Sequence, residues 1–580
     1  MDDRDRTWRR RRPDPDGWRE IAKSNDLHPL AARLLARRGI DSADDARTFL
    51  DPRISRSMND PSLLQDADRG AELAAAAVVE DDPIVVHGDY DADGLCGAAI
   101  LVDFFETLGA EVDYEIPHRL EGSYGLDVET VERLAREGCE LLVTVDCGVS
   151  ARQPIERARE LGLRTVVLDH HQPSSTLPPA DALVDPLRDD CDYPFEGLAA
   201  SGLALHFATA TRRELADRGA LDQRSTPEIG YAVDLVAVGT VADVVPLIDE
   251  NRAFVRRGLQ LVESGRRPGL AALAREACGG LDAVTAEDIA YQIAPRLNAA
   301  GRVGDASVCV ELLTTESAAR ARTLARRLEA KNDERKALQA DVLEEARRLA
   351  SNRLSDDPPA LVVHDEEWHR GVLGVVAGRL ADRLRRPAVV LTEHDGRLEG
   401  SGRSPEAFDL VELLESTAER LERFGGHAAA AGLALEADEL PAFREEFRRA
   451  ADSSLETEQL PAATLAVDET IRLGELDEQF VRNLRAIAPF GQGNPEPRFV
   501  CERLTADESR IVGDDHLKAT FEDGTGSFSG IGFSMGDRME LLDEPVSAAF
   551  TPKYSVFRGR ERLELHLHDL KPAGSVELEP

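Results

Sequence analysis

The sequence predicts an α/β fold in which a domain with a parallel sheet is joined by a long helix to a second α/β unit, followed by a small antiparallel β-barrel. From about residue 83 to 246, apolar runs alternate with helical patterns, which is typical of a parallel α/β sheet. Residues 315–352 contain no Gly or Pro, so we expect one helix of about 50 Å there. After residue 460 the pattern changes to short strands, for which an OB-fold is the first choice.

At 580 residues the chain should contain several domains, since roughly 100–200 residues per domain are usual. The predicted organisation is an N-terminal helical segment (1–75), an α/β domain (76–314), a connecting helix (315–352), a second α/β domain (353–458) and a barrel (459–575). In the first α/β domain, strands are expected at residues 83–89, 140–148 and 164–171, with helices at 96–110 and 152–162.

The composition is that of a soluble globular protein, with 42% hydrophobic and 31% charged residues. The sequence has no run of about 18 apolar residues, so we expect no membrane span. The charged start MDDRDRTWRRRRPDPDG lacks the apolar core of a signal peptide. We therefore expect a cytoplasmic protein with no membrane partner. The seven Cys form no CxxC pair, which argues against zinc ribbons and disulfides and favours reduced thiols.

The net charge of −39 is unusual, and only six of the 70 basic residues are Lys. An acidic surface poor in Lys suits a halophilic cytosol, because at molar salt the Debye length falls to about 3 Å. A GC-rich genome could explain the Arg excess but not the acid excess. Such a charge normally argues against nucleic acid as a partner, although screening at high salt weakens that argument.

Metal-capable side chains follow each of the three predicted strands and one further apolar segment. The four groups are His87 with Asp89, Asp91 and Asp93; Asp146; Asp169 with His170 and His171; and Asp243. In open α/β sheets ligands bind beyond the carboxyl ends of the strands, so adjacent parallel strands would bring these groups together.

Carboxylates mixed with neutral imidazoles suit Mn²⁺ better than Mg²⁺, which prefers oxygen ligands and retained water. Two such ions about 4 Å apart can act on both the attacking and leaving oxygens of a phosphoester. Asp146, alone at a strand tip, is the natural carboxylate to bridge them. Each segment alone could be a helix cap or a solvated loop acid, but four in one α/β block favour a metal site.

The pattern HxxxDxD, a strand-tip Asp, DHH and VADVVP resembles the DHH phosphoesterase superfamily. The match extends to IPHRLEGSYGL, APRLNAAGRVGDAS, WHRGVLGVVAGRL, EGSGRS, FGGHAAAAGL and APFGQGNPEP, which together resemble the RecJ family of single-strand-specific exonucleases. The resemblance implies a parallel-sheet DHH domain, a DHH-associated substrate-binding domain and a C-terminal OB-fold that binds nucleic acid.

By analogy with the related manganese pyrophosphatases, the resemblance also implies two ligand sets. His87, Asp91 and Asp146 would hold one metal, and Asp93, Asp146, His170 and Asp243 the other. Asp89 is a further candidate ligand that could instead position Asp91. The catalytic assignments are Asp146, His171 as a hydrogen-bond donor or acid facing the phosphate, and Asp169 as the residue that orients the His pair.

Substrate-binding residues are expected outside the metal site. In EGSGRS, Ser401, Gly402 and Arg403 would form a flexible loop that holds backbone phosphates. In FGGHAAAAGL, Gly425 and Gly426 permit close backbone approach, and His427 could contact a phosphate at a helix start. Arg302 could be a groove cation or a surface ion pair. Tyr124 and Phe490 could stack bases, although core packing is the commoner role of a single aromatic.

The resemblance implies a 5′ to 3′ exonuclease on single-stranded DNA, using two divalent ions, Mn²⁺ preferred and Mg²⁺ also suitable, in repair and recombination. Its partners would be single-stranded DNA and a single-strand-binding protein, a helicase or GINS-type replisome components. The first alternative is a superfamily exonuclease acting on RNA or with 3′ to 5′ polarity. The second is a non-catalytic scaffold like the Cdc45 relatives, which have degraded ligand sets.

Overall fold

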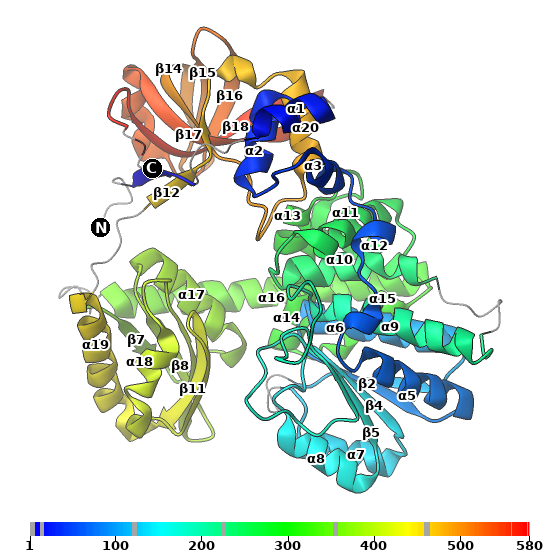
Figure 1. Ribbon diagram of the computed structural model, residues 1–580. Coiled ribbons are helices and arrows are strands. Elements are labelled where there is room, and N and C mark those ends of the chain that lie inside the picture. Colours follow the sequence, from blue (N-terminus) through cyan, green and yellow to red (C-terminus); the bar gives the residue numbers. More distant parts are fainter. Residues whose placement is uncertain are drawn as a thin grey trace. The chain divides into compact units, whose positions relative to one another are not determined.

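The computed structural model describes residues 6–11, 17–118, 125–221, 228–351, 358–457, 464–557, 560–576 and 578 (Figure 1). The chain divides into two compact units. The barrel unit comprises Met1–Met58, Pro246–Ala253 and Pro461–Pro580, and the α/β unit comprises Asn59–Val245 and Phe254–Leu460.

The first part of the α/β unit is a parallel sheet with strand order β3-β2-β4-β5-β6. Its strands are β2 (Ile84–Gly88), β3 (Val112–Glu115), β4 (Leu141–Val145), β5 (Arg164–Leu168) and β6 (Ala182–Val184). The three predicted strands are β2, β4 and β5, and they are direct neighbours. All residues of β2 and β4 are buried, as continuous apolar runs in a doubly covered sheet should be.

Helices cover both faces of this sheet. On one face, α7 (Val128–Glu137) and α8 (Arg152–Leu161) share a core with Val85, Leu142 and Val167. The helices α5 (Ala67–Glu80), α6 (Ala92–Thr107) and α9 (Ala200–Asp217) contact strands from the other face (Figure 1). Because period-2 side chains alternate between the faces, each strand contributes to both cores.

A helical layer follows the sheet and leads to the second α/β domain. Its helices are α10 (Val233–Ala242), α11 (Asp249–Ser264), α12 (Pro268–Cys278), α13 (Ala286–Asp288), the π-helical η3 (Ile289–Ile293), α14 (Ala294–Val303) and α15 (Ser307–Thr314). The predicted long helix is α16 (Ala318–Ser351). It contacts α12, α14 and α15, and its later residues share a core with the second domain, so it does join the two domains.

The second domain has a mixed sheet of order β10-β11-β9-β8-β7. Its elements are β7 (Leu361–His364), η5 (Arg370–Val372), α17 (Leu373–Leu384), β8 (Ala388–His394), β9 (Arg397–Arg403), α18 (Leu410–Glu415), η6 (Ala418–Arg420), β10 (Arg423–His427), β11 (Ala430–Glu436), η7 (Ala437–Glu439) and α19 (Leu440–Thr457). Helices α16 and α17 cover one face of this sheet, and α18 and α19 cover the other.

The barrel unit contains the predicted OB-type barrel. Its elements are β13 (Glu469–Thr470), η8 (Leu473–Glu475), α20 (Glu478–Ile487), β14 (Phe499–Val512), β15 (His516–Glu522), β16 (Ser527–Gly532), η9 (Gly536–Asp543), β17 (Val546–Phe557) and β18 (Arg560–Pro572). An additional pairing of β14 with β17 closes the strands into a barrel. The fold class predicted from the sequence is therefore confirmed.

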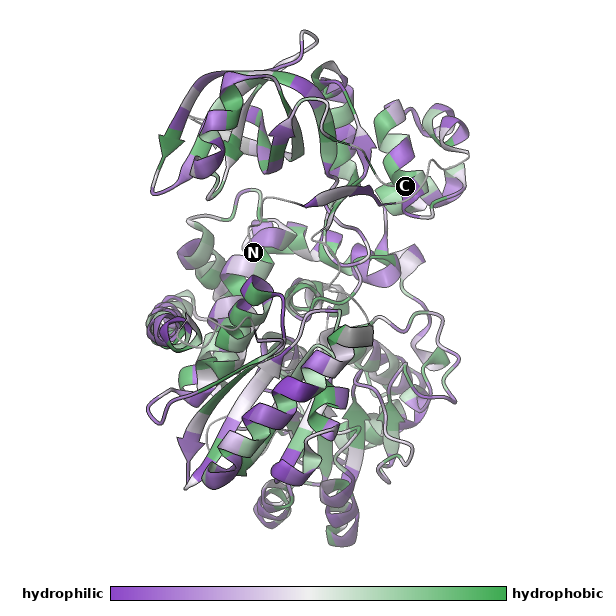
Figure 2. Ribbon diagram, turned by 90° about the vertical axis from the view of Figure 1, so that its left-hand side faces the viewer, coloured by the Kyte–Doolittle hydropathy of each residue, from purple (hydrophilic) through white to green (hydrophobic). Residues whose placement is uncertain are grey.

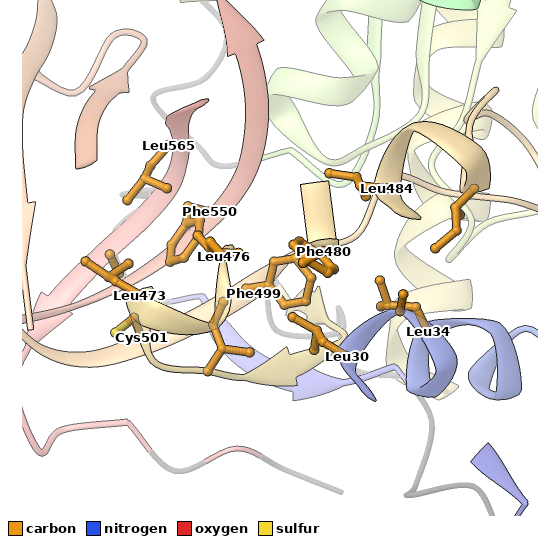
Figure 3. Packing of buried hydrophobic residues seen from close by; sticks show 14 of the residues in the cluster. Leu30, Leu34, Leu473, Leu476, Phe480, Leu484, Phe499, Cys501, Phe550 and Leu565 are labelled. Carbon is orange, nitrogen blue, oxygen red and sulfur yellow. The ribbon is translucent and has the colours of Figure 1, made fainter. Parts of the chain in front are cut away.

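Of the predicted N-terminal segment (1–75), residues 1–58 belong to the barrel unit, whereas residues 59–75 belong to the α/β unit. The segment's elements are β1 (Thr7–Arg10), α1 (Trp18–Asn25), α2 (Pro29–Arg37), α3 (Ala43–Leu50) and α4 (Ile54–Ser57), followed in the α/β unit by η1 (Pro61–Leu63). Leu30 of α2, Phe480 of α20 and Phe499 of β14 pack together in one core (Figure 3). A segment expected to be helical thus begins with a strand, and β1 pairs in parallel with β12 (Thr464–Val467), which lies outside the barrel.

The helices are amphipathic or mixed in character rather than apolar throughout. Figure 2 shows hydrophilic and hydrophobic residues interleaved along the helices. Among the residues that the structure describes, no helix combines the length and the apolar character needed to cross a membrane. All seven cysteines are free thiols, as the absence of CxxC pairs predicted.

Candidate metal centre

The loop between β2 and α6, with the first turn of α6, brings three carboxylates (Asp89, Asp91 and Asp93) to the carboxyl edge of the parallel sheet. Asp91 caps α6: its Oδ1 accepts hydrogen bonds from the amides of Asp93 (2.9 Å) and Gly94 (3.2 Å). A Cβ on Gly94 would lie 2.7 Å from both N and O of Asp89, so only glycine lets the loop fold back over the helix start.

Asp93, one residue into α6, is buried and turned toward α9. Its two carboxylate oxygens accept hydrogen bonds from the amides of Ala200 (2.6 Å) and Ser201 (3.1 Å) at the start of α9. Burial raises the pKa of Asp93, and the charge of His170 together with hydrogen bonding from Ser201 partly offsets that effect.

Asp146 follows β4, between the β2 loop and the end of β5. Its φ of 64° lies in the left-handed region, which Asp tolerates better than most residues. His170 Nε2 lies 3.2 Å from Asp146 Oδ1 and 3.6 Å from Asp243 Oδ2. Asp243 is the C-cap of α10, so the fourth donor segment comes from a helix end rather than from a strand.

Donor atoms from these segments form three groups that share residues. Within each group, the donor atoms all lie within 4.8 Å of one another. The groups are Asp89 with Asp91 and Asp146; Asp93 with His170 and Asp243; and Asp146 with His170 and His171. Asp146 occurs in two of them and His170 in two. Apart from His87, the predicted metal donors are thus brought together, and Asp89 occurs in the same group as Asp91.

His87 is placed differently from the other candidates. The residue is buried in β2, where its ring lies near the backbone of Gly125. Burial lowers the pKa of His87 to about 4, so the imidazole is neutral and its nitrogens can act as ligands. His87 does not belong to any of the three donor groups found among the described residues.

Asp169 organises the two histidines that follow it. Its Oδ1 lies 2.7 Å from His171 Nδ1 and accepts the amide of His170 at 2.8 Å, and its Oδ2 accepts the amide of Val149 at 2.8 Å. Burial by itself raises the pKa of Asp169, but these bonds lower it overall. The hydrogen bond with Asp169 raises the pKa of His171 to about 9. This pair therefore favours a charged imidazolium beside the carboxylates.

The remaining carboxylates are held in an electrostatically unfavourable arrangement. Burial, followed by repulsion from Asp91 and Asp93, raises the pKa of Asp146 well above its usual range. Burial and then Asp93 raise the pKa of Asp243 to about 8. Bound cations would remove this repulsion, and oxygen donors combined with imidazole nitrogens fit Mn²⁺ well. The residues present therefore fit a divalent metal centre.

A second cluster lies around the second α/β domain, where Ser401 and Arg403 share one face of β9. Arg403 Nη1 donates to Ser401 Oγ at 2.8 Å. Both side chains lie against Gly374 of α17, about 3 Å from where a Cβ would be. Arg302 Nη1, from the end of α14, donates to the carbonyl of Gly371 at 3.3 Å. Arg302, Ser401 and Arg403 thus surround residues 371–374, and we name these three the cationic cradle.

Two local predictions in this domain are wrong. The segment EGSGRS is not a flexible loop: Ser401, Gly402 and Arg403 lie in β9, between β8 and β11. His427 is not at a helix start, because it ends strand β10. In register, His427 pairs with Ala430 and Ala430 with Arg403, which places His427 on the Arg403 face about 10 Å away.

The remaining candidates for substrate binding lie in three different places. Gly425 and Gly426 are exposed in β10, the edge strand of the sheet. Tyr124 lies outside the described residues. Phe490 is partly buried against the core of the barrel unit, which matches the structural role rather than a base-stacking one.

Sequence analysis missed Asp185, although it is another Asp that directly follows a strand of the parallel sheet. It follows β6, is fully buried, and its Oδ1 accepts the amide of Leu187 at 2.8 Å. Burial raises its pKa to about 7, and Asp169 adds to the shift. The preceding strand has only three residues, so the signal that marked the longer strands was too weak to find it.

Family models match three regions of the chain. The DHH family N-terminal domain matches residues 83–240, the DHHA1 domain residues 357–453 and the RecJ OB domain residues 467–569. These regions correspond to the parallel-sheet domain, the second α/β domain and the barrel described above.

Curated relatives and solved structures extend the match to the full chain. The single-stranded-DNA-specific exonuclease RecJ of Escherichia coli is 35% identical over 96% of this chain and 98% of its own length. That of Bacillus subtilis is 34% identical over 97% of this chain and 70% of its own length. The crystal structure of RecJ from Thermus thermophilus in complex with Mn²⁺ has a TM-score of 0.84 and 31% identity, covering 100% of this chain and 81% of that one. On this full-length similarity, the chain belongs to the RecJ family of the DHH superfamily.

Proposed function

We propose that the chain is a divalent-metal-dependent exonuclease that degrades single-stranded DNA in the 5′ to 3′ direction, in repair and recombination. The observation that carries the proposal is the convergence of Asp91, Asp93, Asp146, His170 and Asp243 at one edge of the sheet. Full-length similarity to proteins named single-stranded-DNA-specific exonucleases supports the substrate class. The intact donor groups argue against a non-catalytic scaffold.

Two ligand sets are proposed within this cluster. His87, Asp91 and Asp146 would hold one ion, with Asp89 as a candidate ligand beside Asp91. Asp93, Asp146, His170 and Asp243 would hold the other. Mn²⁺ is the preferred ion and Mg²⁺ an alternative, in line with the Thermus thermophilus RecJ structures in complex with each. Such ions supply Lewis-acid stabilisation of phosphodiester oxygens and lower the pKa of water.

His171 and Asp169 supply the proton chemistry in this proposal. Asp169 accepts from Nδ1–H, which leaves the Nε2–H of an imidazolium available to the substrate. With a pKa near 9, His171 is protonated at neutral pH and can donate to a phosphate oxygen as charge develops. Asp169 positions the ring and stabilises its charge.

Phosphate contacts would position the strand relative to the metal centre. The cationic cradle, with Gly402 between its two β9 residues, offers charged donors on one sheet face, and Gly425, Gly426 and His427 extend that face toward the edge strand. Such contacts carry no base information, which suits a sequence-independent nuclease. The OB-type barrel would bind a further stretch of DNA. Protein partners are proposed to be a single-strand-binding protein, a helicase or GINS-type components.

The test is digestion of oligonucleotides labelled at the 5′ or the 3′ end, with Mn²⁺, at low and molar salt. Single-stranded DNA, the same sequence as RNA and blunt duplex DNA are compared. We expect mononucleotides to appear first from the 5′ label of single-stranded DNA, with little release from duplex. Preferential digestion of RNA, or first release of the 3′ label, would contradict the substrate or the polarity. Absence of hydrolysis on every substrate would favour a scaffold.

A further inference from the structure

Helix α14 holds the metal-binding loop on both sides of Asp91. Asn298 Oδ1 accepts the amide of Ala92 at 2.7 Å, just after Asp91. One turn along the same helix, a Cβ on Gly301 would lie 2.9 Å from the carbonyl oxygen of Tyr90, just before Asp91. The backbone of Asp91 is therefore bracketed by two contacts from one helix face.

Together, Asn298 Oδ1 and Asp91 Oδ1 accept the hydrogen bonds of the first three amides of α6, which leaves Asp91 Oδ2 out of the cap. The amides of Asp93 and Gly94 both donate to Asp91 Oδ1, and the amide of Ala92 is taken by Asn298. The first amides of a helix have no partner within the helix, so each needs one from elsewhere. Because Asn298 supplies one of them, the second oxygen of Asp91 is not required for capping.

The same helix also contacts the cationic cradle. Arg302, next to Gly301, donates to the carbonyl of Gly371. Gly371 lies one turn before Gly374, against which Ser401 and Arg403 are placed. One short helix, α14, therefore contacts the loop that carries Asp91 and the segment around which the cradle is built.

We propose that Asn298 is a positioning residue of the metal centre, which acts through the amide of Ala92 to hold Asp91 in its ligating position. The inference rests on the proposed metal centre, in which Asp91 is a ligand. The competing explanation is that Asn298 makes an ordinary helix-packing hydrogen bond that stabilises the fold and nothing else. A third role, direct contact with DNA, is also open to this half-buried side chain.

Four variants separate these roles. Asn298→Leu has nearly the same volume but no acceptor, and Asn298→Asp retains the acceptor oxygen. Gly301→Ala would press on Tyr90 from the same helix while leaving the Asn298 side chain unchanged. The matched control is Asn332→Leu on α16, which removes a buried Asn that accepts from Arg335 at 2.9 Å, in a region without metal donors.

Each variant is measured in three ways: Mn²⁺ binding by electron paramagnetic resonance of the free ion, kcat and KM on single-stranded DNA, and melting temperature in EDTA. We expect Asn298→Leu and Gly301→Ala to weaken Mn²⁺ binding by about 10- to 100-fold, the usual effect of removing a group that orients a metal ligand. The value of kcat should fall at limiting Mn²⁺, whereas KM for DNA stays unchanged. Asn298→Asp should remain within about threefold of the wild type, and Asn332→Leu should lower only the melting temperature.

Unchanged Mn²⁺ binding in a folded Asn298→Leu protein overturns the proposal. A change in melting temperature alone would then indicate the packing role, and a change in KM alone would indicate DNA contact. If Asn298→Leu does not fold, unchanged Mn²⁺ binding by Gly301→Ala overturns it equally. Mn²⁺ binding by Asp146→Asn, measured in parallel, distinguishes failure of the proposed metal centre from failure of the proposed role of Asn298. If Asp146→Asn retains its Mn²⁺, the proposed metal centre itself fails; if it loses Mn²⁺ and Asn298→Leu does not, only the positioning role fails.

Discussion

Asp243 shows how a single carboxyl group links proton binding, metal binding and folding. Its pKa is raised to about 8 by burial and by neighbouring carboxylates, against an ordinary value of 3.8. A group that binds its proton more tightly in the folded state than in the unfolded state makes folding less favourable as pH rises between those two values. The metal-free protein should therefore lose stability over this range.

We predict that the melting temperature of the metal-free protein falls as pH rises from about 5 to 8. Saturating Mn²⁺ should reduce this fall, because the cation stabilises the ionised carboxylate. Asp243→Asn, which removes one of the groups with a raised pKa, should make the metal-free profile less steep. The measurement is a thermal melt in EDTA and in Mn²⁺ across this range. A metal-free protein that becomes more stable toward pH 8 would contradict the prediction.

His171 should separate catalysis from metal binding. We predict that His171→Ala lowers turnover by about 10²- to 10⁴-fold, the usual contribution of a positioned acid. Mn²⁺ binding should be mostly preserved, since the ring is already engaged by Asp169. Rate measurements and Mn²⁺ titration of the same preparation test this division. Equal loss of Mn²⁺ and of activity would make His171 a ligand instead.

Most residues of the candidate site could be predicted because they follow strands. Asp91, Asp146 and His170 come after apolar runs that end at one sheet edge, so sequence order alone implies proximity. Asn298 could not be found in this way. It lies 206 residues from its partner Ala92, and its role depends on a helix crossing that periodicity does not report.

Strand β9 places two of the three residues of the cationic cradle, Ser401 and Arg403. Ser401 and Arg403 point to the same face because side chains alternate along a strand, and pairing with β8 and β11 fixes their position. Gly400 and Gly402, which flank Ser401, suggested a loop in the sequence. A Cβ on Gly400 would collide with the carbonyl oxygen of Val390, so close packing of the strands explains this glycine.

We predict that Arg403→Ala and His427→Ala weaken single-stranded DNA binding without changing Mn²⁺ binding. Affinity should fall about equally for oligonucleotides of different base composition, because phosphate contacts carry no base information. Arg397→Ala, at the other end of β9 in an exposed ion pair with Glu422, is the matched control and should bind normally. Fluorescence anisotropy on several sequences tests this. Strong discrimination between base compositions would exclude a phosphate-binding role.

At the scale of the whole molecule, some pairings join segments far apart in the sequence. Strand β1 pairs in parallel with β12, and Arg37 of α2 forms a buried ion pair of 2.8 Å with Glu469. Local patterns identified the helices of the N-terminal segment and the strands of the barrel. They could not predict that the two would share a core, because such contacts depend on long-range assembly.

The net charge of −39 leads to a prediction about salt. Unscreened carboxylates repel one another and the DNA, so stability and activity should both increase as the Debye length shrinks. We predict an activity optimum above about 1 M monovalent salt, where the Debye length is about 3 Å. Melting temperature and nuclease rate measured from low to molar KCl test this. Maximum stability and activity at low salt would exclude the halophilic interpretation and leave the nuclease proposal intact.

The carboxylates and histidines at the sheet edge are proposed to bind the ions on which DNA hydrolysis depends. The decisive variant is Asp146→Asn, because Asn also tolerates the φ of 64° and the fold should persist. We predict that the variant melts cooperatively, binds less Mn²⁺ and loses hydrolysis of single-stranded DNA by at least about a thousandfold. Near wild-type turnover by this folded variant with Mn²⁺ in excess would contradict the claim.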